Sequence, residues 1–398
     1  YLKEDQKMAT LIPIAEPRPT HSLALFELAF RPFFLLGAVF ALFAVLPWML
    51  NLHGMAFNPH INAMWWHSHE MIFGFALAII MGFLLTAAQN WTGVPSPRDI
   101  PLMVLVGLWL LPRLFLPVAH SLPIGVLMAS DVLAGAGVAL VLARMVFKAK
   151  QWRNLPFALM VGMLTVLNGL SYWTASHDNM LGAMRIHEAA LLWVALVMNM
   201  LGGRVIPFFT ERASSYTRQN EPKWLLSVSN IALILTSVTM LLDNDVALRI
   251  SAAASALIVF YRWNHWGWRA SFHNPLLWSL HLSFACLPLA CALLAFGYPR
   301  SGALHLFTIG AMTGLIVSMM SRVSLGHTGR ELKVARPLPW AYGLLFIAGL
   351  ARASAAIWPQ MYLPLLDITL TCWMLALGIF VYYYAGVLLR PRVDGRRG

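Results

Sequence analysis

The chain has 398 residues, of which 59% are hydrophobic and only 11% are charged. A soluble domain carries roughly a quarter charged residues, so this composition excludes an ordinary soluble protein and predicts a polytopic membrane protein. The net charge of +12 does not indicate nucleic-acid binding, because the basic residues are spread among short loops between apolar runs. The three cysteines lie within apolar runs, which argues against a disulfide framework, and no CxxCH motif offers covalent haem attachment.

Residues 1–30 are polar and lack the hydrophobic region and cleavage site of a signal peptide. We expect a cytoplasmic N-terminal segment, in which residues 1–7 are an added extension before a native start at Met8. A spanning helix needs about 20 mostly apolar residues, and the chain offers twelve such runs. They lie near 33–52, 70–89, 100–118, 123–146, 155–175, 186–206, 224–242, 246–263, 276–297, 303–321, 338–358 and 362–388.

The orientation follows from the Lys and Arg residues, which are retained on the cytoplasmic side of a membrane. Twenty-three of the 28 lie in the termini and in every second loop, whereas the alternate loops hold only Arg185, Arg249 and Arg300. This asymmetry predicts that both termini are cytoplasmic and that residues 391–398 form a basic cytoplasmic tail. The expected location is the inner membrane of a bacterium.

A histidine recurs with a period of 118 residues, at His69, His187 and His305, and each is followed 23 residues later by a threonine. Each histidine begins a predicted helix that runs inward from the outer surface. The period predicts three four-helix repeats, over 31–150, 151–270 and 271–390. The expected fold is therefore all-α, with twelve transmembrane helices in three four-helix repeats.

Three histidines in register suggest a metal site. If their helices line a common axis, the imidazoles of His69, His187 and His305 converge at one depth and form a good site for copper. The alternative is that each histidine serves only its own repeat. His67 lies two residues before His69, on the opposite side of a helix, so it suits a second centre that binds haem. His281 lies inside a predicted span, where haem ligation and a hydrogen bond to a neighbouring helix are both open.

Charged side chains also fall in or beside the apolar runs. Glu70 and Glu188 follow two of the histidines and are candidate proton carriers or supports for histidine ligands. Arg113 and Arg352 lie towards the outer face, where they could bind haem propionates. Pairing of the arginines with Asp131 or Asp367 between helices is the structural alternative.

Several segments resemble the NnrS family, membrane proteins that hold haem and copper and are associated with nitric oxide metabolism and resistance. The match is carried by Phe30-Arg31-Pro32-Phe33-Phe34, by 67–75 (HSHEMIFGF), by 90–93 (NWTG) and by 322–330 (RVSLGHTGR). The resemblance implies haem b and copper as cofactors, but it does not say which histidine binds which. It also leaves the role of His327 open, since that residue belongs to an inner segment.

The expected architecture is in addition similar to the catalytic subunits of haem-copper oxidases and nitric oxide reductases, although their paired histidines on helix 7 are missing here. We therefore expect a membrane haem-copper protein that binds nitric oxide and reduces it to N2O, with electrons from a quinol or an external donor. A non-catalytic sensor or scavenger of nitric oxide and a twelve-helix transporter are the alternatives.

Overall fold

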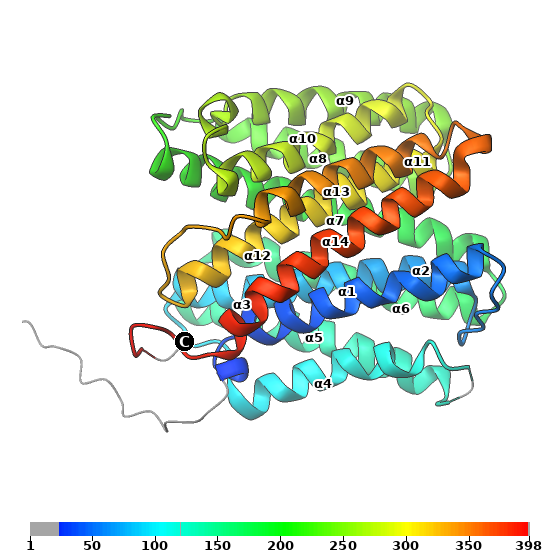
Figure 1. Cartoon of the computed structure of the whole chain (residues 1–398), viewed down its shortest axis with the longest axis horizontal. Coiled ribbons are helices and arrows are strands. Elements are labelled where there is room, and N and C mark those ends of the chain that lie inside the picture. The colour runs from blue at the N-terminus through cyan, green and yellow to red at the C-terminus, as the bar shows by residue number, and fades with distance from the viewer. Residues whose placement is uncertain (1–23, 120, 397–398) are drawn as a thin grey trace, which may run out of the picture.

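A computed structural model of the chain describes residues 24–119 and 121–396, and helices are the regular structure of these residues (Figure 1). Most of the expected 1–30 segment and the last two residues of the expected tail lie outside the described part. The elements in chain order are η1 (Ala24–Phe26), α1 (Phe30–Leu52), α2 (Ala63–His69), η2 (Glu70–Ala76), α3 (Leu77–Thr92), α4 (Asp99–Phe115), α5 (Ile124–Ala149), η3 (Trp152–Asn154), α6 (Leu155–Ser176), α7 (Met180–Ala213), α8 (Lys223–Leu241), α9 (Asp245–Asn264), η4 (Trp268–Ser271), α10 (Pro275–Ala295), α11 (Arg300–His305), η5 (Leu306–Thr313), α12 (Gly314–His327), α13 (Leu338–Ser354), η6 (Pro359–Met361) and α14 (Tyr362–Leu389).

Within the described residues, ten helices are long and apolar enough to cross a membrane. Helices α4 and α13 have 17 residues each, slightly fewer than the roughly 20 that a bilayer needs. An all-helical, multi-pass membrane protein is therefore confirmed, whereas twelve spans in three repeats stay a prediction.

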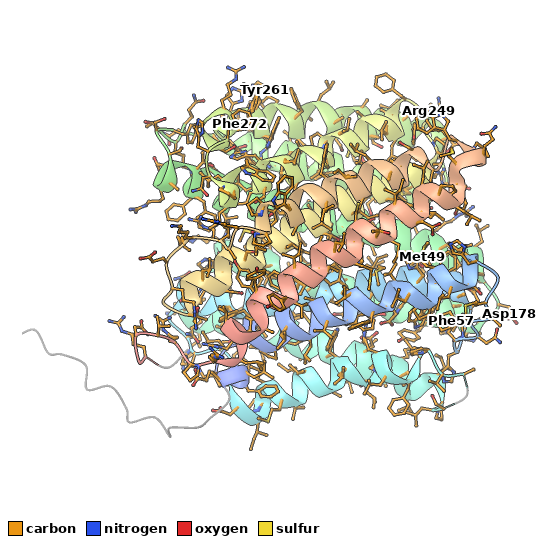
Figure 2. All side chains as sticks on the ribbon, in the orientation of Figure 1. Met49, Phe57, Asp178, Arg249, Tyr261 and Phe272 are labelled. Carbon is orange, nitrogen blue, oxygen red and sulfur yellow. The ribbon has the colours of Figure 1, made fainter. Side chains whose placement is uncertain are left out.

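The bundle has two ends, which Figure 2 shows at opposite sides of the view. Met49, Asp178 and Arg249 mark the end that we call the histidine end, because His67, His187 and His305 lie near it. Tyr261 and Phe272 mark the other end, which we call the basic end, where the last helix finishes (Figures 1 and 2). Most consecutive long helices pack against each other, and the chain runs back and forth between the two ends.

The three histidine-bearing helices begin earlier than the apolar runs predict, at residues 63, 180 and 300 instead of 70, 186 and 303. For the first two helices the reason is local capping. Asn62 Oδ1 accepts a hydrogen bond from the backbone of Trp65 at 2.7 Å, and Asn179 Oδ1 accepts one from Gly182 at 2.9 Å. The histidines consequently lie one to two turns inside their helices and not at the helix mouths.

A π-helical segment follows two of the histidines directly. Segment η2 starts at Glu70 after His69, and η5 starts at Leu306 after His305, which places the two starts two 118-residue periods apart. Helix α7 continues as a regular α-helix past His187. Single π-turns inside α-helices are frequent at functional sites, so both segments direct attention to the histidine end.

Farther from the histidine end, α3, α7 and α12 face a common axis. Residues 10 and 14 positions after each histidine line one small apolar chamber of about 70 Å³. These residues are Ile79, Val197 and Leu315 at the first offset, and Phe83, Leu201 and Met319 at the second. Equivalent positions from three helices therefore meet in space, which supports the predicted 118-residue repeat.

The first and last helices meet at the basic end. Arg31 is fully buried, and its Nη1 donates hydrogen bonds to the carbonyls of Leu388 and Arg390 at 2.9 and 2.8 Å. The guanidinium thereby satisfies carbonyls that the end of α14 leaves without partners in the helix. Arg392 donates to the carbonyl of His327 at 2.6 Å in the same region. His327 thus lies about 33 Å from His305 along the helix, in a contact that joins α12 to the end of the chain.

Candidate haem site and buried charge cluster

A cavity of about 360 Å³ opens between the helices at the histidine end. His67, His187 and His305 line it from three different helices, together with Glu188 and Arg352. Much of the remaining wall is apolar or aromatic, including Trp48, Phe75, Leu191, Ile309, Met312 and Trp373. A largely apolar cavity with a few convergent polar groups is the usual form of a site for a small molecule or cofactor.

His305 presents one ring nitrogen for a ligand. Its Nδ1 lies 2.6 Å from the carbonyl oxygen of Ser301, which can only accept, so Nδ1 carries the proton. In the neutral ring Nε2 is then the nitrogen with a free lone pair. A metal-binding histidine usually has this arrangement, in which one nitrogen donates to a carbonyl and the other binds the metal.

His67 and Arg352 both line the cavity. The His67 ring stacks on Trp48 with ring centroids 5.1 Å apart, and its Nδ1 is buried without a hydrogen-bond partner among the described residues. Arg352 donates from Nη2 to Ser301 Oγ at 3.0 Å, and its buried Nη1 likewise has no such partner there. Buried polar atoms of this kind need a partner, and a bound ligand would supply it.

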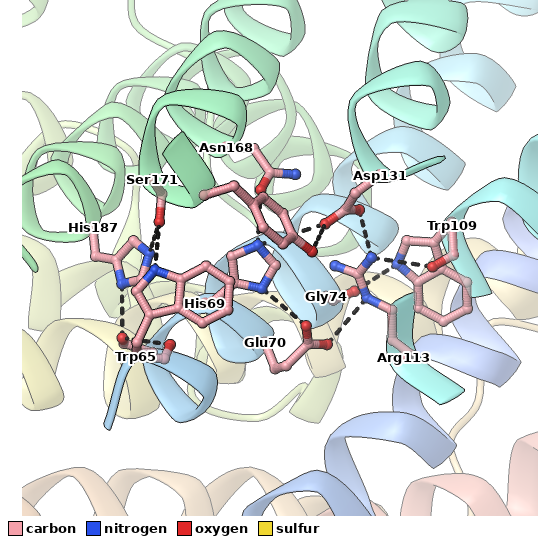
Figure 3. Close-up of polar contacts among 12 residues, drawn as sticks. Trp65, His69, Glu70, Gly74, Trp109, Arg113, Asp131, Asn168, Ser171 and His187 are labelled. Atoms are coloured by element: carbon pink, nitrogen blue, oxygen red, sulfur yellow. Dashed lines mark hydrogen bonds and ion pairs between the residues drawn. The ribbon is translucent and has the colours of Figure 1, made fainter. Parts of the chain in front are cut away.

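Behind the cavity lies a buried charge cluster of His69, Glu70, Arg113 and Asp131 (Figure 3). Glu70 lies between His69 and Arg113, with Oε1 2.9 Å from His69 Nδ1 and Oε2 3.1 Å from Arg113 Nε. Arg113 Nη1 donates to Asp131 Oδ1 at 2.5 Å, and Tyr172 donates to the other Asp131 oxygen at 3.3 Å. Each charged side chain of the cluster is at most 2% exposed.

Hydrogen bonds and ion pairs engage every charged group of this cluster. His69 Nε2 lies 2.8 Å from Asn168 Oδ1 and His69 Nδ1 faces Glu70, so both ring nitrogens have a side-chain partner. The guanidinium of Arg113 lies between the carboxylates of Glu70 and Asp131. Pairing with an opposite charge offsets part of the cost of burying each ion. Because both of its nitrogens are engaged, His69 has none left for a metal in this arrangement.

His187 connects the cluster to the cavity. Ser68 Oγ donates to backbone carbonyls and so accepts from His187 Nδ1 at 2.7 Å. Ser171 Oγ accepts from the indole of Trp65 at 2.9 Å and donates to His187 Nε2 at 2.5 Å. The imidazole of His187 is therefore neutral, with both nitrogens held by hydroxyl groups. Its ring centroid lies 6.0 Å from that of His69.

The predicted site residues thus divide into separate groups. The cavity receives His67, His187, His305, Glu188 and Arg352, whereas the buried cluster takes up His69, Glu70 and Arg113. The described residues contain no group of three or more His, Cys, Asp or Glu that could hold a metal ion. As they stand, the three register histidines do not fit a shared copper site, and the pair of arginine and aspartate expected as an alternative is present at Arg113 and Asp131.

His281 lies apart from both groups. It is 2% exposed, and its Nε2 lies 2.9 Å from Thr210 Oγ1 near the basic end. The contact joins α10 to α7, which is the hydrogen bond between helices that the sequence left open beside haem ligation. Thr210 is one of the three threonines that follow the register histidines.

Glu188 links the cavity to a network of surface ion pairs. Its side chain is 27% exposed, and Oε2 lies 3.9 Å from Arg300 Nη1. Arg300 also binds Asp243 and Asp245, and Arg185 binds Asp243. The hydrogen bond from Arg300 and the charge of Arg185 hold the pKa of Asp243 below its ordinary value. Charged side chains therefore connect the surface to the cavity, which they reach at Glu188.

Sequence reasoning did not single out several residues that shape these sites. They are Trp48, Asn168, Ser171, Tyr172 and Ser301. Two signals were present: Asn168 and Ser171 are polar residues within an apolar run, and Ser301 precedes His305 by four residues, one helical turn. Trp48 and Tyr172 carried no such signal.

Comparison with known protein families gives a match over most of the chain. A family model described as NnrS protein matches residues 24–392, nearly the whole chain. No curated protein matches it significantly.

Proposed function

The chain belongs to the NnrS family, which fits a membrane protein related to nitric oxide, and we propose that it binds haem b in the cavity and reduces nitric oxide to N2O. One observation carries the haem proposal: His67, His305 and Arg352 line a single cavity of about 360 Å³ and keep polar atoms available. The cavity wall fits a porphyrin in its chemistry, because it is apolar and aromatic around these three side chains.

Each of these residues has a role toward the cofactor. The Nε2 lone pair of His305 would bind the haem iron, with its ring fixed by the carbonyl of Ser301. His67 is the second candidate ligand, and Trp48 fixes the plane of its ring. Arg352 is suited to pair with a propionate carboxylate, since a guanidinium recognises carboxylates through two parallel hydrogen bonds. Bound haem would supply an iron centre for the binding and reduction of nitric oxide.

Glu188 is the proposed carrier of protons, in preference to Glu70. Reduction of two nitric oxide molecules to N2O and water consumes two protons and two electrons. Glu188 reaches both the cavity and the surface ion pairs, so it can pass protons between them. Glu70 is enclosed in the buried charge cluster, where its proposed role is to hold His69 and Arg113 in place. The electrons come from a quinol or an external donor in this proposal.

Copper remains part of the proposal as a second metal, but no step is assigned to it, because the register histidines do not form a ligand set here. The proposed membrane arrangement has twelve spans in three repeats, with α4 and α13 as short spans. Both termini lie on the cytoplasmic side of a bacterial inner membrane in this arrangement. The clustering of Lys and Arg in alternate loops supports this orientation.

Absorption spectra and metal analysis of purified protein test the proposal. We expect stoichiometric haem in the unaltered chain, strong loss of haem in His305→Ala, and full haem in the control His53→Ala, whose half-exposed imidazole pairs with Asp367 outside the cavity. Nitric oxide consumption with N2O formation by reduced protein tests the catalytic part. Haem binding without N2O under any donor would leave a scavenger or sensor, and a protein without haem would favour a transporter.

A further inference from the structure

The apolar chamber between α3, α7 and α12 is not used by the proposed function. It has a volume of about 70 Å³, and its walls carry only hydrophobic side chains and Gly202. A cavity needs about 10–15 Å³ of such volume for one water molecule, so the chamber is large enough for several small molecules. Size alone therefore does not keep it empty.

The chamber has no means of holding water. A buried water molecule makes about three hydrogen bonds, and hydroxyl, amide and charged side chains are missing from the chamber residues. Enclosed apolar cavities stay dry and bind apolar ligands such as xenon. The wall of this chamber is equally apolar, although side chains at its rim such as Phe83, Ile316 and Met319 are partly exposed. The same physical property suits a small diatomic gas, which has little to gain from water.

Met312 lies between the chamber and the large cavity and lines both of them. It lines the large cavity together with Ile309 and His305, and it lines the chamber together with Leu315 and Ile316. Methionine is unbranched and adaptable, so its side chain can change rotamer without disturbing a rigid wall. Met312 also lies in the π-helical segment that begins directly after His305.

We infer that the chamber is a binding site for a small apolar gas, nitric oxide in this chain, which it holds on the central axis next to the cavity. The identity of the gas rests on the proposed function, whereas the gas-binding property rests on the chamber walls. Met312 separates the held gas from the cavity, and its rotation lets the gas pass to the side on which His305 lies.

Xenon is the probe that tests the chamber without reference to haem. In crystals of the full chain pressurised with xenon, we expect anomalous density between α3, α7 and α12. Ile316→Trp fills the chamber and should abolish this density. The matched control is Ile347→Trp, because Ile347 is exposed on α13 and does not line the chamber. Val197→Leu, a milder filling of the same space, should lower the xenon occupancy if the tryptophan variant does not fold.

A kinetic measurement tests the connection to the cavity. In protein that has bound haem, we expect Ile316→Trp to slow the association of nitric oxide after flash photolysis, with Ile347→Trp unchanged. Absence of xenon from the chamber, or an acyl chain or ordered water found in it, overturns the inference. Xenon in the chamber of a protein that binds no haem supports the chamber and refutes the haem proposal. Haem without xenon refutes only the chamber.

Discussion

Asp131→Asn is expected to destabilise the protein strongly, because it removes the nearer of the two carboxylates that pair with the buried Arg113. Asp131 and Arg113 are 2% and 1% exposed in their side chains, and their atoms approach to 2.5 Å. Removal of one partner from a buried ion pair typically costs about 3–5 kcal/mol, since the other charge remains in a low-dielectric environment. Arg113 keeps Glu70 as a partner, which places the expected loss near the lower value, about 3 kcal/mol.

Asp367→Asn is the matched control for this prediction. Asp367 also pairs with a basic side chain, but it and His53 are 51% and 41% exposed. Exposed pairs contribute about 0–1 kcal/mol. The free energy of unfolding in detergent, followed by circular dichroism, measures both variants. If the two variants lose equal stability, the balance of buried charges is not what holds these helices together. The double variant Asp131→Asn with Arg113→Met should recover part of the loss by removing the buried cation that has lost its nearer carboxylate.

Three further predictions concern packing, pH and the basic end. Gly74→Ala should lower the free energy of unfolding by about 1–3 kcal/mol, because the added Cβ would lie 2.6 Å from the Glu70 carboxylate. The control Gly107→Ala meets no atom within 4 Å and should be neutral or slightly stabilising. Equal stability of the two variants in unfolding measurements would contradict this prediction. Asp243 has a pKa below its ordinary value of 3.8 in the folded protein, so its ion pairs stabilise the fold at pH values above 3.8. This stabilisation is lost as the pH falls through the lower pKa of the folded state. Asp243→Asn should remove this part of the acid dependence when unfolding is measured over a series of pH values. Arg31→Leu should cost roughly 2 kcal/mol by leaving two carbonyls at the end of α14 without donors, with proteolysis of the C-terminal segment as the measurement.

The positions of the helices could be predicted from the sequence because hydropathy is a local property. An apolar run of spanning length forms a helix whatever its neighbours are, so every predicted run corresponds to a helical segment. The 118-residue period led to the expectation that three imidazoles converge, whereas the equivalent positions that meet in the chamber are apolar ones such as Val197 and Leu315. The first residue of each helix could be predicted less accurately, because Asn62 and Asn179 cap helices that hydropathy alone begins six or seven residues later.

The division of the histidines between two sites could not be predicted in this way. Which faces of α6 meet α2 and α7 depends on packing between helices, so the contacts of Asn168 with His69 and of Ser171 with His187 leave no trace in sequence spacing. The period indicated His69 as the shared metal position and His67 as the additional one. In the structure His67 lines the cavity and His69 faces the buried carboxylates.

The two π-helical segments account for part of the difference among the three histidines. A π-turn adds one residue to a helical turn, so it rotates the part of the helix before it by about 100° relative to the part after it. His69 and His305 precede such segments, whereas His187 is followed by regular α-helix. If the three helices are aligned at the chamber, His187 must therefore face a different direction from its two counterparts. The separation of His69 from His305 has another cause, because both precede a π-helical segment: His69 is held by Glu70 and Asn168, whereas Nδ1 of His305 bonds to the carbonyl of Ser301 and the ring lines the cavity. Helix rotation and local hydrogen bonds together divide the histidines between the cavity wall and the charge cluster.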